Sequence, residues 1–149
     1  FRLYSDGRGK YNFTVPAGGS ELPSSNETIE KGLHYFQMDG REVYETGTKV
    51  LPKAINQVLS DTGLSINDID YMIPHQPSIV ILKKTAEIIG LPFEKVMTNM
   101  DKYANTSGGT IPILLDELKK SKRLNNGDII LFAAVGSGWT YGASIIKWS

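Results

Sequence analysis

The chain contains no cysteine among its 149 residues. That absence excludes a disulfide framework, a cysteine-ligated zinc cluster and a thiol nucleophile contributed by these residues. With only two histidines, we expect no metal site, and the balance of 16 basic and 16 acidic residues predicts no nucleic-acid partner. No apolar run approaches the roughly 20 residues of a membrane span. We therefore expect a cytoplasmic protein that does not contact membranes.

The sequence begins with Phe1 instead of methionine, and no long apolar stretch follows a basic start. We therefore expect the chain to be a piece of a longer protein. Its length suits one domain with its own core, which we place over residues 1–149. Residues 1–40 are rich in Gly, Ser, Asn and Pro. This composition predicts strands at 11–15 and 33–36, joined by loops that lead in from a preceding segment.

Helical and strand patterns alternate over the rest of the chain. Helices are predicted at 41–60, 77–89 and 108–122, and strands at 69–74, 96–99, 128–134 and 143–148. Pro52 is expected to kink or break the first helix, and Pro77 suits the first turn of the second. This order predicts an α/β domain with a mixed sheet, whose last two strands pair through the glycine-rich loop 136–142.

Two polar side chains lie where core elements end, which is where α/β proteins usually hold ligands. His75 follows the apolar strand, and Asn105 opens a turn of small residues before the third helix. A neutral imidazole and an amide can donate hydrogen bonds to one developing oxyanion. Each residue alone is equally compatible with a helix cap or a turn. The glycine loop is not a phosphate-binding fingerprint, because no helix follows it.

Taken together, segments 74–76, 105–107 and 138–143, with 38–44 upstream, resemble β-ketoacyl-acyl-carrier-protein synthase III of the thiolase-like superfamily. The similarity covers the chain from about residue 30 onward and matches the C-terminal half of that enzyme. It implies half of an αβαβα fold. It also implies a decarboxylative Claisen condensation of an acyl thioester with malonyl-acyl carrier protein in fatty-acid or related biosynthesis. Coenzyme A and phosphopantetheine thioesters would be substrates, and no cofactor is expected.

The resemblance assigns a role to individual residues. His75 and Asn105 match the catalytic pair of the family, and Ser137 matches the residue whose backbone N–H completes the oxyanion hole, where the family usually has glycine. Substrate-binding positions are matched by Met38, Gly40, Tyr44, Ser78, Gly136 and Gly138. The family's nucleophilic cysteine lies in the other half of the enzyme, so we expect this chain alone to be inactive.

Two further departures from the family pattern follow His75. Ser78 stands where the family commonly has an asparagine that contacts substrate, which leaves the choice of substrate open. Val80 stands where the family often has an arginine used in carrier-protein docking, and Lys83 and Lys84 are candidates to replace it. This pattern predicts a divergent member of the family.

The partners implied by the resemblance are acyl carrier protein, acyl-CoA, the protein's own N-terminal half and a second copy in a homodimer. Two alternatives stay open. One is a different acyl transfer on the same thiolase-like scaffold. The other is a non-catalytic subunit that completes another chain, although such a subunit has no need of both His75 and Asn105.

Overall fold

A computed structural model describes residues 1–149. Its strands are β1 Arg2–Ser5, β2 Phe13–Thr14, β3 Gln37–Met38, β4 Tyr71–Pro74, β5 Ile129–Gly136 and β6 Thr140–Lys147. Its α-helices are α1 Asn26–Glu30, α2 Gly40–Thr62, α3 Ile79–Ile89, α4 Met100–Tyr103 and α5 Thr110–Lys120. Short 3-10 turns cover Gly7–Gly9, Ile66–Asp68, Phe93–Lys95 and Ser107–Gly109. No helix combines the length and apolar character needed to cross a membrane.

The main sheet has the strand order β1-β6-β5-β4. β4 is parallel to β5, whereas β5 pairs antiparallel with β6 and β6 antiparallel with β1. The predicted mixed sheet is therefore confirmed, and so is the pairing of the last two strands through the glycine-rich loop. Because β4 and β5 are parallel and are connected through α3, α4 and α5, their carboxyl ends lie at the same edge of the sheet.

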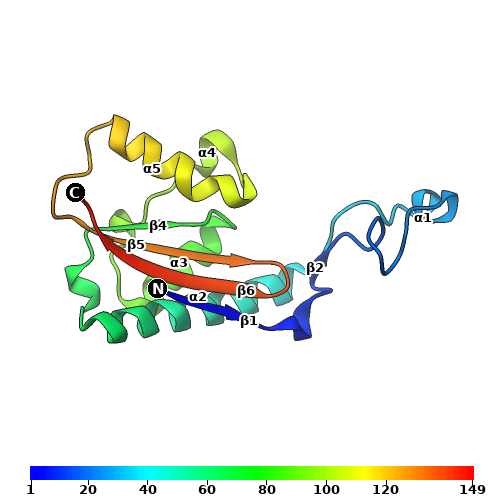
Figure 1. The fold of residues 1–149 in the computed structure, drawn as a ribbon, viewed down its shortest axis with the longest axis horizontal. Helices are drawn as coiled ribbons and strands as arrows, with labels where there is room; N and C mark the ends of the chain where they lie inside the picture. The colour runs from blue at the N-terminus through cyan, green and yellow to red at the C-terminus, as the bar shows by residue number, and fades with distance from the viewer.

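Helices cover the sheet from both sides (Figure 1). α2 and α3 pack against Leu131, Ala133 and Val135 of β5, whereas α5 packs against the alternating residue Ile130 and against Ile73 of β4. This alternation follows from the period of two along a strand. The helices on one face and the helix on the other make an αβα layer arrangement.

α2 begins at Asp39, whose carboxylate accepts hydrogen bonds from the backbone N–H groups of Arg41 and Glu42. It ends at Gly63, which has a left-handed conformation with φ 68°. Of the kink or break predicted at Pro52, the break does not occur, because α2 continues through this residue. A proline inside a helix costs about 3 kcal/mol, but buried side chains on either side, such as Leu51 and Ile55, each contribute about 1.5–3 kcal/mol.

Close contact between α2 and α3 depends on Gly47. A methyl group at this position would lie 3.3 Å from Cγ2 of Ile81, which is tighter than ordinary van der Waals contact. The missing side chain therefore lets the two helices approach over the sheet, where Leu82 and Ala86 of α3 are buried with Val58 of α2.

Other boundaries differ from the sequence prediction. The predicted strand at 96–99 is wrong, because only Val96 bridges to Met72 before the chain turns. The predicted strand at 33–36 is also wrong, since this segment is a turn and the strand follows at Gln37–Met38. α3 begins two residues later than predicted, because Ser78 caps it by accepting a hydrogen bond from the Val80 N–H.

The segment between β2 and β3, which includes α1, extends away from the sheet (Figure 1). It folds back on itself through hydrogen bonds such as that from the Ala17 N–H to the Leu33 carbonyl. At its base, Phe13 of β2 pairs with Met38 of β3. This small sheet brings the start of α2 close to the turn between β5 and β6, because the Ser137 hydroxyl donates to the Phe13 carbonyl.

Candidate active site

His75 lies directly after β4. Its backbone N–H donates to the Ala133 carbonyl of β5 at 2.8 Å, so the sheet fixes its position. The imidazole is half-buried, and its Nδ1 lies 2.8 Å from Oγ1 of Thr110 at the start of α5. Burial lowers the pKa of His75 below 6.5, and the nearby Ser107 carbonyl opposes this shift only in part. The imidazole is therefore neutral near pH 7.

Asn105 lies in the turn that joins α4 to α5. The preceding residue, Ala104, has φ 55° and ψ −150°, and Ser107 has φ 54°. The Asn105 Oδ1 accepts a hydrogen bond of 2.8 Å from the Ser107 N–H. Since the side-chain carbonyl is used in this way, the amide N–H groups of Asn105 are left to donate to a ligand.

The structure connects these two segments. Thr110 contacts Nδ1 of His75 and donates to the Ser107 carbonyl at 3.0 Å, and the Ser107 N–H in turn contacts Asn105. His75 and Asn105, which are 30 positions apart in sequence, are thus joined through three hydrogen bonds, two of the Thr110 hydroxyl and one of the Ser107 N–H. The result is a neutral ring and a free amide on neighbouring loops.

A broad open cavity of about 1180 Å³ lies beside His75. Ser107 and Thr110 line it, and so do residues of β1, β5 and β6: Leu3, Phe132, Ala134, Gly136, Ser144 and Ile146 among them. Its wall is mostly apolar because it is the part of the sheet face that α5 does not cover. The arrangement can hold an apolar chain while polar donors at one side contact its functional group.

The glycine-rich loop forms a tight turn between β5 and β6. Gly136 lines the cavity with His75. Ser137 is exposed, and Gly138 has φ 135°, a conformation that favours glycine. Ser137 itself does not have a positive φ. The backbone at this position therefore accepts a serine where the family usually has glycine.

The remaining predicted substrate positions lie apart from this cavity. Met38, Gly40 and Tyr44 belong to β3 and the first turns of α2, and none of them lines it. Ser78 caps α3. Met38 is nevertheless linked to the glycine loop, since it pairs with Phe13, whose carbonyl accepts from Ser137. Their roles in substrate binding stay predictions.

Sequence reasoning missed a buried polar network behind the two loops. The Gln76 side chain, which is fully buried, donates to the carbonyls of Pro74 and Met97 and accepts from the Asn99 N–H. The Asn99 amide then donates to Glu117 at 2.8 Å. The signal available in the sequence was an amide next to His75, which is too common to single out.

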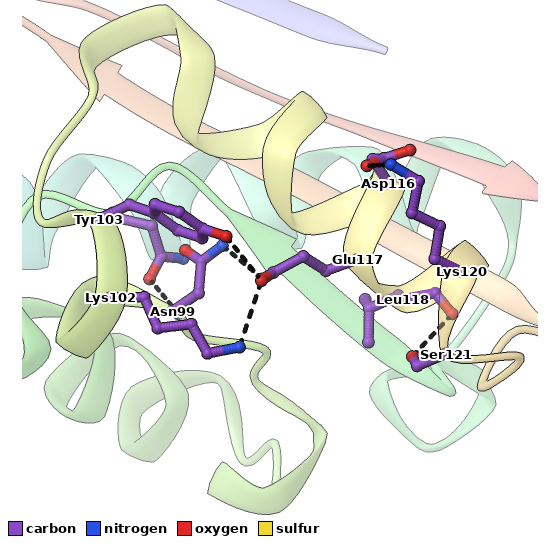
Figure 2. Close-up of polar contacts among 9 residues, drawn as sticks. Asn99, Lys102, Tyr103, Asp116, Glu117, Leu118, Lys120 and Ser121 are labelled. Atoms are coloured by element: carbon purple, nitrogen blue, oxygen red, sulfur yellow. Dashed lines mark hydrogen bonds and ion pairs between the residues drawn. The ribbon is translucent and has the colours of Figure 1, made fainter.

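Glu117 is the end point of this network (Figure 2). Besides Asn99, it accepts from Nζ of Lys102 and the hydroxyl of Tyr103, each at 3.2 Å. The Asn99 hydrogen bond, followed by the Lys102 contacts, lowers the pKa of the Glu117 carboxyl below its usual 4.5. Lys102 and Tyr103 belong to α4, so their hydrogen bonds to Glu117 hold this helix, and the Asn105 turn that follows it, against α5.

No group of three or more His, Asp or Glu side chains is arranged as metal ligands. The residues around His75 offer hydrogen-bond donors instead. The imidazole of His75 lines the cavity, whereas the exposed amide of Asn105 does not. Neutral hydrogen-bond donors of this kind suit the stabilisation of negative charge on an oxygen atom.

A mixed sheet layered with helices, with two donor loops at the ends of its elements, is half of a thiolase-like α/β fold. A family model described as the C-terminal part of 3-oxoacyl-[acyl-carrier-protein] synthase III matches residues 59–148. The chain belongs to this family.

Relatives and solved structures agree with this assignment. The chain is 44% identical over 147 residues to a β-ketoacyl-[acyl-carrier-protein] synthase III of Caldanaerobacter subterraneus, and 39% identical over 146 residues to one of Symbiobacterium thermophilum. These matches cover 99% and 98% of this chain but 44% of each relative. The crystal structure of 3-oxoacyl-[acyl-carrier-protein] synthase III from Aquifex aeolicus matches 99% of this chain and 43% of its own, with a TM-score of 0.83 and 31% identity. The chain thus spans less than half the length of the curated relatives it matches.

Proposed function

We propose that this chain is the C-terminal part of a β-ketoacyl-acyl-carrier-protein synthase III-like acyltransferase. The observation that carries the proposal is the neutral, half-buried His75, joined through Thr110 and Ser107 to the Asn105 turn beside an apolar cavity. A family member needs such a pair to hold a thioester oxygen. The names of the relatives support acyl carrier protein as a partner.

In the proposed reaction, His75 and Asn105 donate to the carbonyl oxygen of a malonyl thioester. The bond to the malonyl carboxylate breaks, carbon dioxide leaves, and the bonding electron pair forms an enolate whose oxygen the two donors stabilise. The enolate carbon then attacks an acyl thioester and forms the new carbon–carbon bond, and the thiolate leaves. The oxyanion formed on the acyl group would be held by the Ser137 N–H.

The acylated thiol must come from outside these 149 residues, since they contain no cysteine. We propose that it is supplied by an N-terminal half of the same protein, and that the complete enzyme is a cytoplasmic homodimer. Coenzyme A and phosphopantetheine thioesters serve as substrates in this proposal, and no cofactor takes part.

The test uses the full-length parent protein, labelled acyl-CoA thioesters and malonyl-acyl carrier protein. We expect carbon dioxide release with a ketoacyl product, and a loss of about 10²-fold or more in either His75→Ala or Asn105→Ala, because each removes a donor to developing charge. His34→Ala, the other histidine, is the matched control and should keep full activity. Acyl-enzyme formation without carbon dioxide release would indicate a different acyl transfer and reject the proposal.

A further inference from the structure

Thr110 is the first residue of α5 and is 2% exposed. Its hydroxyl makes two contacts, one of 2.8 Å with Nδ1 of His75 and one of 3.0 Å with the Ser107 carbonyl. Both partners are fixed by the backbone, since His75 follows β4 and Ser107 begins the 3-10 turn before α5. The Thr110 hydroxyl is the one side-chain group that forms a hydrogen bond with the imidazole.

A count of hydrogens determines the direction of these bonds. A threonine hydroxyl has one hydrogen, and a carbonyl can only accept. If Thr110 donates its hydrogen to Ser107, the hydroxyl has only lone pairs to offer to the imidazole. Nδ1 must then carry the ring hydrogen, and Nε2 is left with a lone pair.

We propose that Thr110 is a positioning residue that holds the neutral His75 ring in the Nδ1–H tautomer when no ligand is bound. This inference rests on the proposed function, in which His75 donates to a thioester oxygen. Nε2, the nitrogen that Thr110 does not contact, is then an acceptor toward the cavity that His75 lines. In this resting form the ring accepts a hydrogen bond from a thiol or hydroxyl instead of donating one to a carbonyl oxygen.

The donor role in the condensation requires the other tautomer, which Thr110 also permits. The hydroxyl can rotate from Ser107 toward Nδ1 and donate to it, because the Ser107 carbonyl keeps the backbone N–H of Thr110 as a donor. One proton leaves Nδ1 for solvent and one is taken up at Nε2, so the net charge is unchanged. A thioester oxygen near Nε2 would thus select the donor tautomer, whereas the empty site prefers the acceptor tautomer.

The test reads the tautomer directly by long-range ¹H–¹⁵N NMR of the ¹⁵N-labelled chain. His34→Gln is introduced first, so that His75 is the sole histidine. Spectra are taken well above pH 6.5, where the ring is neutral. With Thr110 in place, we expect a protonated Nδ1 and an unprotonated Nε2. Thr110→Ser should preserve this pattern. Thr110→Val should convert the ring to majority Nε2–H, the form preferred by free imidazole.

Thr85→Val is the matched control, because Thr85 is a buried threonine of α3 whose hydroxyl has no partner. It should leave the His75 signals unchanged. A majority of the Nε2–H tautomer in the chain that keeps Thr110 would overturn the proposal, whether or not Thr110→Val folds. Retention of Nδ1–H in Thr110→Val would also overturn it, since the Ser107 carbonyl alone would then hold the tautomer.

These readouts need no enzymatic activity and are therefore independent of the proposed function. If the complete enzyme releases no carbon dioxide but the tautomer pattern is as expected, the function is wrong and the role of Thr110 stands. If condensation occurs but the resting ring is Nε2–H, the function stands and Thr110 has no role in tautomer selection.

Discussion

The side-chain amide of Asn99 donates a 2.8 Å hydrogen bond to Glu117, and this bond joins the segment before the Asn105 turn to α5. Glu117 also accepts from Lys102 and Tyr103, so one carboxylate holds three donors (Figure 2). The neighbouring carboxylate of Asp116 pairs only with the exposed Lys120. Adjacent acidic residues of α5 therefore have different structural roles.

This difference predicts the effect of two alanine substitutions on stability. Glu117→Ala leaves the buried Asn99 amide without its partner, which is destabilising, whereas Asp116→Ala removes an exposed ion pair of little value. We expect the thermal midpoint to fall by several degrees in Glu117→Ala and to change little in Asp116→Ala. Calorimetry on both variants measures this, and equal effects would show that the network does not hold α4 to α5.

The lowered pKa of Glu117 predicts how this contribution varies with pH. A carboxyl whose folded pKa lies below its unfolded value stabilises the fold fully above the unfolded pKa, here 4.5, and loses this effect as pH falls through the folded pKa. The stability difference between the parent chain and Glu117→Gln should therefore be constant near pH 7 and shrink below pH 4.5. Denaturant titrations across this range measure it, and a difference that grows toward acid would contradict the assignment.

Sequence periodicity was sufficient to predict the large elements. The long apolar stripe of α2 and the apolar run of β5 bury large areas, so local pattern and tertiary packing agree. The strand predicted at 96–99 failed because apolar residues alone do not show whether a neighbour is available. Only Val96 forms a β-bridge with β4, at Met72, before the chain turns into α4.

The candidate site was predictable only in part for the same reason. His75 and Asn105 stand out as polar residues at the ends of elements. Gln76 and Asn99 are 23 positions apart, and Asn99 and Glu117 are 18 apart. Such partners are chosen by the fold, and nothing in the local sequence distinguishes an amide buried between two segments from one on the surface.

Thr85 offers a test of a buried hydroxyl without a partner. It is fully buried in α3, and its Oγ1 makes no hydrogen bond. Valine has nearly the same shape without the polar atom, so Thr85→Val should raise the free energy of unfolding by about 1–3 kcal/mol. Thr28, whose hydroxyl takes part in the capping box of α1, is the control. Thr28→Val should give no increase, and a loss of stability in Thr85→Val would reveal an additional partner of its hydroxyl.

The backbone of Ala104 predicts a stabilising substitution beside Asn105. Its φ of 55° and ψ of −150° lie in a region that side chains disfavour by about 1–3 kcal/mol. Glycine removes this strain but costs about 0.5–1 kcal/mol through the greater freedom of the unfolded chain. Ala104→Gly should therefore increase the free energy of unfolding by about 1 kcal/mol in denaturant titrations.

Gly63 gives the reverse experiment, because it ends α2 with φ 68° and has no neighbouring atoms that a methyl group would meet. Gly63→Ala should therefore lower stability by conformational strain alone, by about 1 kcal/mol. Opposite signs at the two positions would show that backbone conformation, and not contact, determines both effects. If Ala104→Gly were destabilising, the Ala104 methyl group would have to contribute more than its strain costs, and the Asn105 turn would be held by packing at Ala104 as well as by Glu117.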